Sequence, residues 1–222
     1  RSQTSFATIS GPLMSAMFSP TTRRSGGAPA WSDQTVDFTL DAIVEKIQQL
    51  AKLRPWLEWH FIGPLQSNKT RDVAEHFDWV HSIDRLKIAE RLSSQRGEFP
   101  DLGDLQVCVQ INVSEEESKS GIALEEVEAL CDAVAKLPNL VLRGLMAIPA
   151  PSDDVNQQRR AFAAVRECFV GIKAKHSNDV GYDFFDTLSM GMSDDMEAAI
   201  AEGSTMVRIG SAIFGKRDKI KA

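Results

Sequence analysis

The sequence has little of several residue types, and each shortage excludes a class of protein. Only 3 of its 222 residues are cysteines, and they are too widely spaced for a disulfide framework, so we expect reduced thiols in the core of a cytoplasmic protein. No apolar run is long enough to span a bilayer, so no membrane association is expected. The net charge of -6 argues against binding to nucleic acid, because a duplex binder needs a basic face.

Motifs for metal binding and hydrolysis are also missing. The 4 histidines show no metal-ligand spacing, so no metal site is predicted and each is interpreted as a structural or surface residue. No Ser/His/Asp nucleophile elbow is present. The sequence also has no lysine before Lys46.

What remains is the composition of an ordinary globular protein, with 43% hydrophobic and 25% charged residues. From about residue 36 onward, short apolar β-rich runs alternate with amphipathic stretches, which predicts a parallel sheet with right-handed crossovers. The expected strands are residues 57–62, 79–83, 105–113, 140–148, 187–190 and 206–214. The expected helices are residues 41–53, 68–77, 84–96, 124–137, 155–175 and 194–203.

The predicted fold class is therefore α/β, specifically a (β/α)8 TIM-like barrel whose first two βα units are abnormal or incomplete. Residues 1–35 are interpreted as a divergent, poorly ordered segment and residues 36–222 as the barrel domain. Short strands are expected at residues 4–9 and 35–40, and unless they close the sheet its edge strands stay open, which lowers stability. The Arg/Ser-rich start also has features of a transit peptide, which is the less favoured interpretation.

The stretch TLSMGMSDDMEAAIAEGSTMVRIGSAIFG, residues 187–215, is the most informative part of the chain. It predicts a buried strand, a small-residue turn, a helix, and a second strand that contains an arginine and small residues. Asp194 and Glu197 have the spacing of a capping box, and Gly203 stands where a helix C-cap belongs. Free N–H groups at a helix start attract anions, so two such turns in succession predict a phosphate cup.

Further residues are expected at the carboxyl-end mouth of the barrel. Gly63 and Asn68 follow the strand that contains His60, although Asn68 equally fits a cap of the next helix. Met146 ends another strand. Lys119 is a candidate mouth lysine, with a solvated loop lysine as the default interpretation.

Four motifs now identify a family: HFIGPLQSNK (residues 60–69), SKSGI (118–122), RGLMAIP (143–149) and SMGMSDDMEAAIAEGSTMVRIGSAIFG (189–215). From about residue 45 to its end, the chain resembles the pyridoxal phosphate homeostasis proteins, single-domain relatives of the alanine racemase barrel. The resemblance implies pyridoxal 5′-phosphate (PLP) at the mouth and a role as cofactor carrier or buffer, without robust catalysis, for PLP-dependent client enzymes. It also implies a phosphate surrounded by Ser189, Gly191, Met192, Arg208, Gly210 and Ser211.

One departure from the family changes the expected chemistry. The family holds its cofactor as a Schiff base on a lysine in a Val-Ser-Lys-like motif of the first strand, and a Phe-Gly-Glu-Asn-like motif ends the second. Neither motif is present, and VDFTLD at residues 36–41 is a poor remnant of the second. We therefore predict no catalytic residue and noncovalent PLP binding, or attachment to another lysine such as Lys119, in a monomer or weak dimer. The alternatives are a degenerate scaffold or, less favoured, a racemase-like enzyme.

Overall fold

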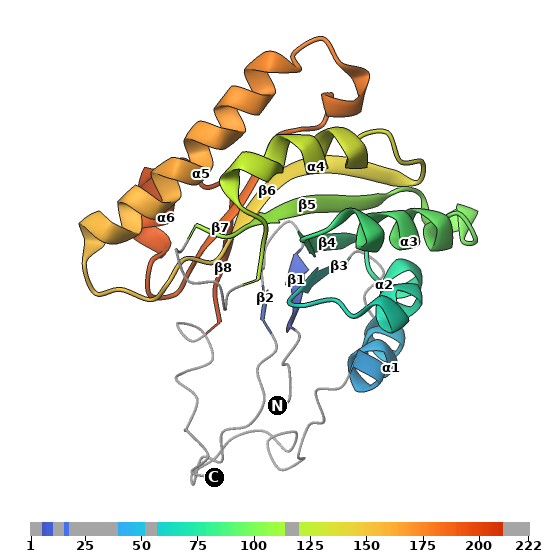
Figure 1. Ribbon diagram of the computed structural model, residues 1–222. Coiled ribbons are helices and arrows are strands. Elements are labelled where there is room, and N and C mark those ends of the chain that lie inside the picture. The colour runs from blue at the N-terminus through green and yellow to red at the C-terminus, as the bar shows by residue number, and fades with distance from the viewer. Residues whose placement is uncertain (1–5, 11–15, 18–39, 52–56, 114–119, 211–222) are drawn as a thin grey trace, which may run out of the picture.

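A computed structural model describes residues 6–10, 16–17, 40–51, 57–113 and 120–210. Their strands form one 8-stranded sheet in the order β2-β1-β3-β4-β5-β6-β7-β8. Figure 1 shows this sheet curling across the molecule, with helices along its outer side. The strands are β1 (Phe6–Ser10), β2 (Ala16–Met17), β3 (Glu58–Ile62), β4 (Trp79–Ile83), β5 (Leu105–Ile111), β6 (Leu140–Ala147), β7 (Thr187–Met192) and β8 (Met206–Arg208).

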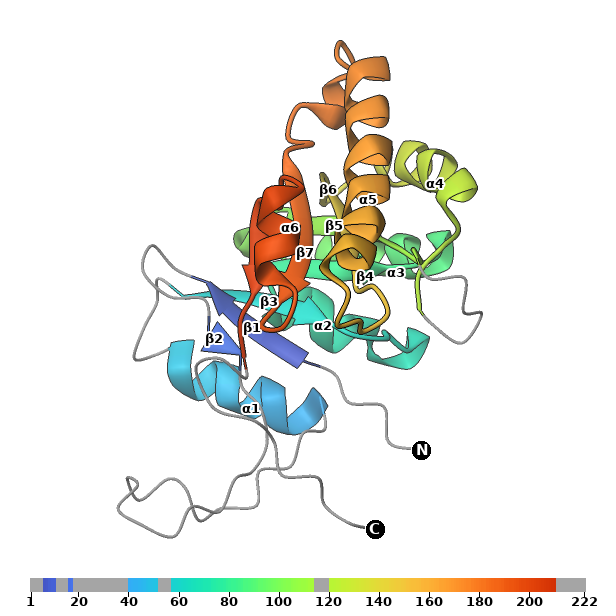
Figure 2. The same cartoon turned by 90° about the vertical axis from the view of Figure 1, so that its left-hand side faces the viewer.

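The six strands from β3 to β8 are the parallel half of the sheet. Each pairs in parallel with the next one along the chain, which confirms the predicted parallel α/β arrangement. Together they make a curled half-barrel, seen from a second side in Figure 2. The last predicted strand extends past β8 into residues 211–214, which lie outside the described part of the chain.

The start of the chain departs from a regular barrel. The strand predicted at residues 4–9 is present as β1, but β1 pairs antiparallel with β3, and β2 pairs antiparallel with β1. The short connection of residues 11–15 accounts for the second pairing, because a parallel crossover needs a dozen residues or more. The first two units are thus abnormal, as expected. Residues 35–39 and most of the segment 1–35 lie outside the described residues.

Helices pack on the outer face of the sheet (Figure 1). The longest, residues 155–175, was predicted with these bounds; it begins after Asp154, whose carboxylate accepts the N–H of Asn156, and carries lysines in its last turn. The α-helices of the described ranges are α1 (Leu40–Ala51), α2 (Thr70–His76), α3 (Leu86–Arg96), α4 (Val127–Val134), α5 (Val155–Lys175) and α6 (Met196–Ala201).

Alternation along the strands separates two apolar regions. A large cluster joins the helices to the outward face of the sheet; Phe61 and Val80 belong to it. A smaller inner cluster lies on the concave face and consists of Ile62, Trp79, Cys108 and Met146, with Ile148 and Met206 packed against it. The functional side chains described next lie among these inward positions.

Two further expectations are tested by the described residues. Cys108, Cys131 and Cys168 are all free thiols, as predicted. Of the helices in the described ranges, none is long and apolar enough to cross a membrane.

Candidate functional site

The carboxyl end of β8 places a charged side chain in the interior. Arg208 is 1% exposed and pairs in register with Met192 of β7. Its Nη1 donates to the carbonyl oxygen of Ser189 at 2.7 Å and to the Ser189 hydroxyl at 2.9 Å, and its Nη2 donates to the carbonyl oxygen of Ala147 at 2.9 Å. The guanidinium therefore connects β6, β7 and β8 near their carboxyl ends.

A line of buried hydrogen bonds continues from this arginine across the inner face of the sheet. Nδ1 of His81 lies 2.9 Å from the Ser189 hydroxyl oxygen, and Nε2 of His81 lies 2.8 Å from Nδ1 of His60. His60 also stacks on Trp79, with ring centroids 5.1 Å apart. We call Arg208, Ser189, His81 and His60 the buried polar chain.

Burial determines the charge state of the buried polar chain. Burial lowers the pKa of His60 to about 4. The pKa of His81 lies well below its usual range because of burial first, and of the neighbouring His60 and Arg208 second. The pKa of Arg208 is lowered to about 10, again chiefly by burial. At neutral pH both imidazoles are therefore neutral and the guanidinium keeps its charge.

The guanidinium of Arg208 has hydrogen-bonding capacity left over. A guanidinium carries five N–H donors, and the bonds to Ser189 and Ala147 use three of them. Nε is buried with no acceptor within the described residues, and one proton of Nη2 is also left by these bonds. An unsatisfied buried donor costs about 1–3 kcal/mol, and more when it is charged. Such a site favours a ligand that supplies acceptor oxygens.

The carboxyl end of β7 requires a glycine at the second-last residue of the strand, Gly191. Gly191 has φ +96, and a Cβ there would lie 2.5 Å from the side chain of Ala199. Two backbone N–H groups of the predicted cup already have acceptors in the chain: Met192 donates to Asp195 Oδ1 at 2.5 Å, and Gly210 donates to the hydroxyl of Ser193 at 3.3 Å. A phosphate would have to replace these acceptors to use either group.

The predicted capping box at the next helix is wrong. The N-cap of α6 is Asp195, not Asp194, and it makes no side-chain cap bond, because its carboxylate accepts from the turn instead. The helix is also shorter than predicted, so the dipole argument for anion binding at its start loses force. The predicted C-cap is displaced by one residue: the C-cap is Glu202, and Gly203 follows it with φ +87 and donates its N–H to the carbonyl oxygen of Ile200 at 3.0 Å.

The structure brings most of the predicted cup residues together. Ser189 bonds directly to Arg208, Met192 pairs with Arg208, and the N–H of Gly210 donates to Ser193 in the turn after β7. Ser211 lies outside the described residues.

The predicted mouth residues divide into two groups. His60 belongs to the buried polar chain, and Met146 lies in the inner apolar cluster. The N–H of Gly63 is tied to the hydroxyl of Ser82 at 2.8 Å. Asn68, by contrast, is exposed in a 3-10 turn (Ser67–Lys69) and does not cap α2, whose N-cap is Lys69. Lys119 lies outside the described residues.

Sequence analysis missed the role of His81, because it treated all histidines alike. A signal was available: His81 is two residues from Trp79 in a buried strand, so the two side chains share one face. Strand periodicity alone does not show which polar group faces His81, because Ser189 is 108 residues away.

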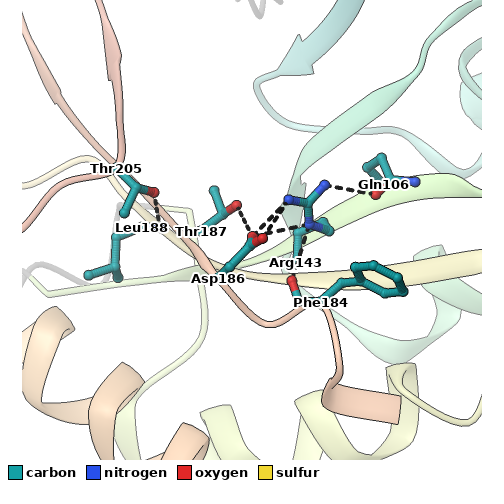
Figure 3. Close-up of polar contacts among 7 residues, drawn as sticks. All are labelled: Gln106, Arg143, Phe184, Asp186, Thr187, Leu188 and Thr205. Atoms are coloured by element: carbon teal, nitrogen blue, oxygen red, sulfur yellow. Dashed lines mark hydrogen bonds and ion pairs between the residues drawn. The ribbon is translucent and has the colours of Figure 1, made fainter. Parts of the chain in front are cut away.

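A second polar cluster braces the opposite, amino ends of the strands (Figure 3). Nη2 of Arg143 donates to both carboxylate oxygens of Asp186 at 2.8 Å, and Nη1 donates to Gln106 at 3.1 Å. Nε donates to the carbonyl oxygen of Phe184 at 3.1 Å, and the guanidinium lies 4.6 Å from the ring centroid of Trp79. This cluster orients β5, β6 and β7 without contributing to the cup.

Comparison with known proteins identifies the family to which this architecture belongs. The family model of the alanine racemase N-terminal domain matches residues 28–218. The chain is 58% identical over 179 residues to the pyridoxal phosphate homeostasis protein of Escherichia coli K12, covering 80% of this chain and 73% of that protein. It is 56% identical over 183 residues to the protein of the same name from Pseudomonas aeruginosa, covering 82% and 75%.

Solved structures agree with this family. PipY of Synechococcus elongatus with PLP bound has a TM-score of 0.69 and 32% identity, covering 80% of this chain and 79% of that one. An alanine racemase from Clostridium difficile, with a TM-score of 0.59 and 15% identity over 80% of this chain and 46% of its own, shares the fold alone. The chain therefore belongs to the pyridoxal phosphate homeostasis protein family, which is built on the alanine racemase N-terminal domain.

Proposed function

We propose that this protein binds pyridoxal 5′-phosphate noncovalently, chiefly through the phosphate group, and carries or buffers the cofactor without robust catalysis. The observation that carries the proposal is the buried guanidinium of Arg208, which keeps its charge and has an unsatisfied Nε. A relative of the same family, PipY, has been solved with PLP bound.

The residues present fit a phosphate ester. Charge-assisted hydrogen bonds from arginine to phosphate are strong, and burial strengthens them because water does not screen them. The hydroxyl of Ser189 accepts a hydrogen bond from the same guanidinium, and Gly191 follows two residues later on β7. When bound, the cofactor would supply an electron-withdrawing ring and an aldehyde.

The placement of the lysines supports noncovalent binding. The described lysines all belong to helices or turns outside the strands, and those other than Lys69 are exposed. They are Lys46, Lys69, Lys87, Lys136, Lys173 and Lys175. None of these described lysines stands on a strand facing the buried polar chain, so covalent attachment would require one elsewhere, such as Lys119.

The proposed role is delivery of the cofactor to PLP-dependent client enzymes by a monomer or weak dimer. Its free thiols suit the reducing cytoplasm. Amino-acid chemistry on PLP needs a proton acceptor beside the substrate. The two histidines of the buried polar chain are engaged with each other and with Ser189, which favours binding over turnover.

One observation favours the alternative of a scaffold that has lost the cofactor. The N–H groups of Met192 and Gly210 are already bonded to Asp195 and Ser193, which is the arrangement expected of a cup closed on itself.

Equilibrium titration with PLP, read by absorbance, distinguishes noncovalent cofactor binding from a scaffold that has lost the cofactor. We expect saturable PLP binding, and we expect Arg208→Lys to weaken it at least tenfold, because a lysine ammonium cannot reproduce the several hydrogen bonds of the planar guanidinium. Arg143→Lys is the matched control: it makes the same change at the other end of the strands and should leave affinity within about twofold. Equal affinity in the two variants contradicts the proposal, and absence of saturable binding supports the scaffold.

A further inference from the structure

We propose that Glu128, Asp132 and His176 form a binding site for one divalent transition-metal ion, for which Zn²⁺ is the best fit. Glu128 and Asp132 lie one turn apart on α4, and His176 is the C-cap of α5. The sequence predicted no metal site, because 48 residues separate His176 from Glu128 and only the packing of the two helices brings them together. None of the three belongs to the buried polar chain, so the metal site does not depend on cofactor binding.

The ligand atoms of the three side chains stand at the spacing of a metal site. Nε2 of His176 lies 3.4 Å from Oε1 of Glu128 and 3.4 Å from Oδ1 of Asp132, and all three atoms lie within 4.8 Å of one another. Two ligands bound tetrahedrally at about 2.1 Å from one zinc ion are about 3.4 Å apart. A direct N–H···O hydrogen bond is usually shorter, at about 2.7–3.2 Å. The imidazole therefore stands where a shared ion requires it, and not where a hydrogen bond alone would draw it.

Neighbouring groups hold two of the ligands in this arrangement. The hydroxyl of Tyr182, a buried residue of the 3-10 turn Val180–Tyr182, donates to Oδ1 of Asp132 at 2.6 Å. The Tyr182 ring also stacks on the imidazole of His176, with ring centroids 4.2 Å apart. Nδ1 of His176, the nitrogen that the ion would not use, faces Oδ2 of Asp179 at 3.7 Å. Outer carboxylates and hydroxyls that orient a ligating imidazole and a ligating carboxylate are typical of metal sites.

The donor set selects the class of ion. Two carboxylates and an imidazole in its neutral, ligating form carry two negative charges, which a divalent cation balances. Imidazole suits zinc and its transition-metal neighbours, whereas Ca²⁺ and Mg²⁺ prefer oxygen ligands alone. Three protein ligands leave the fourth position of a tetrahedral zinc ion to water. Such an ion joins α4 to the end of α5.

Lys175 competes with the ion for one of its ligands. Its Nζ contacts Oε1 of Glu128, the oxygen that the ion would use. The lysine side chain is 65% exposed, so it can turn into solvent when an ion takes its place. Lys175→Met removes the competing ammonium and keeps the apolar stem, so it should strengthen Zn²⁺ binding by roughly threefold or more.

The test is isothermal titration calorimetry of the purified full-length protein with Zn²⁺, without PLP. We expect one saturable site per chain, which His176→Gln and Glu128→Gln should each weaken at least tenfold, because each removes a ligand. His76→Gln is the matched control, because His76 also lies beside a carboxylate, with Nε2 3.9 Å from Oε1 of Glu75. It should leave the affinity unchanged. Circular dichroism of the metal-free variants checks that each is folded.

A further variant distinguishes a metal site from attraction to an acidic surface. Tyr182→Phe keeps every charge and the ring that stacks on His176, but it removes the hydroxyl that holds Asp132. Loss of such an outer contact should weaken Zn²⁺ binding about tenfold. A merely electrostatic patch would not respond, so an unchanged affinity in Tyr182→Phe contradicts the proposed coordination.

Other outcomes also overturn the metal site. They are absence of saturable Zn²⁺ binding, an affinity that His176→Gln leaves unchanged, and binding of Ca²⁺ or Mg²⁺ as tight as that of Zn²⁺. Titration with Co²⁺ should give no sulfur-to-cobalt charge-transfer absorption, and its appearance would place the ion on a cysteine instead. Each of these results leaves the proposed cofactor binding untouched, because the PLP titration tests that binding separately.

Discussion

Single residues in this site combine burial with polarity, and this combination explains both their stability cost and their use. Arg208 is buried with an unsatisfied Nε, and His60 and His81 are buried neutral. Natural interiors rarely leave a buried donor such as this Nε without an acceptor unless a ligand completes it. Arg208 was predicted as a site residue from its place in the second small-residue turn, but the desolvation that controls all three groups depends on neighbours far along the chain.

The depressed pKa of His60 makes stability depend on pH. Its folded value of about 4 lies below the ordinary value of 6.5, so the unfolded chain binds the proton first as pH falls. The contribution is therefore full above pH 6.5 and is lost between about pH 6.5 and 4, on the order of 3 kcal/mol for this group. Urea unfolding across this range should show the decline. His60→Gln should make the decline shallower, with the part due to His81 remaining, whereas a slope as steep as that of His76→Gln would contradict this assignment.

Backbone conformation at Gly191 gives a second residue-scale prediction. Gly191→Ala combines positive φ with a 2.5 Å contact to Ala199, so we expect a loss of about 2–4 kcal/mol in unfolding free energy and weaker PLP binding. Gly171→Ala is the matched control, because it lies in α5 with nothing within 4 Å of the new Cβ. It should stabilise the protein by roughly 0.5–1 kcal/mol. Urea unfolding of both variants tests this, and equal stabilities would contradict it.

Among the elements, the segment β7–turn–α6 shows where sequence patterns succeed and fail. The strand, the turn and the glycine stop are local features and were each predicted, but the strand runs to Met192 instead of ending at Met190, so the turn begins later than expected. The N-cap was misplaced by one residue, because Asp194 and Asp195 are equivalent in sequence while only Asp195 reaches the N–H of Met192. The strands themselves were easy to find, since parallel strands buried on both faces are continuous apolar runs.

The carboxylate of Asp195 should oppose the binding of an anion. It occupies the N–H of Met192 and lies close enough to raise the pKa of Arg208 against the effect of burial. Asp195→Asn keeps an acceptor oxygen but removes the negative charge, so PLP affinity should rise by roughly threefold to tenfold. Asp194→Asn removes the same charge from an exposed neighbour and should change affinity by less than about twofold. Titration followed by PLP fluorescence measures the affinity of both variants. Equal effects of the two substitutions would exclude a local role for the Asp195 carboxylate.

For the whole molecule, the half-barrel from β3 to β8 agrees closely with the arrangement predicted from the sequence. The arrangement of the first two strands, β1 and β2, does not. The antiparallel pairing of β1 on β3 was not predicted, since a short segment with no clear periodicity specifies neither direction nor register. The site avoids this uncertainty because Arg208, Ser189 and His81 all belong to the parallel half.

Ligand binding should therefore stabilise the molecule as a unit. At a PLP concentration of a hundred times Kd, the free energy of unfolding should rise by about 2.7 kcal/mol. For a domain of this size that corresponds to a rise in Tm of roughly 5–10 °C. Differential scanning calorimetry measures it, with pyridoxal as the control ligand. An unchanged Tm under saturating PLP would contradict binding to the folded state.

We propose that the phosphate cup, not a lysine, holds the cofactor. The most direct test is a titration of the purified protein with PLP and with pyridoxal, read by visible absorbance, followed by borohydride reduction and peptide mass spectrometry. We expect saturable binding of PLP, much weaker binding of pyridoxal, and no cofactor trapped on any peptide. A stoichiometric trapped adduct, equal affinity for pyridoxal, or no saturable binding would contradict it.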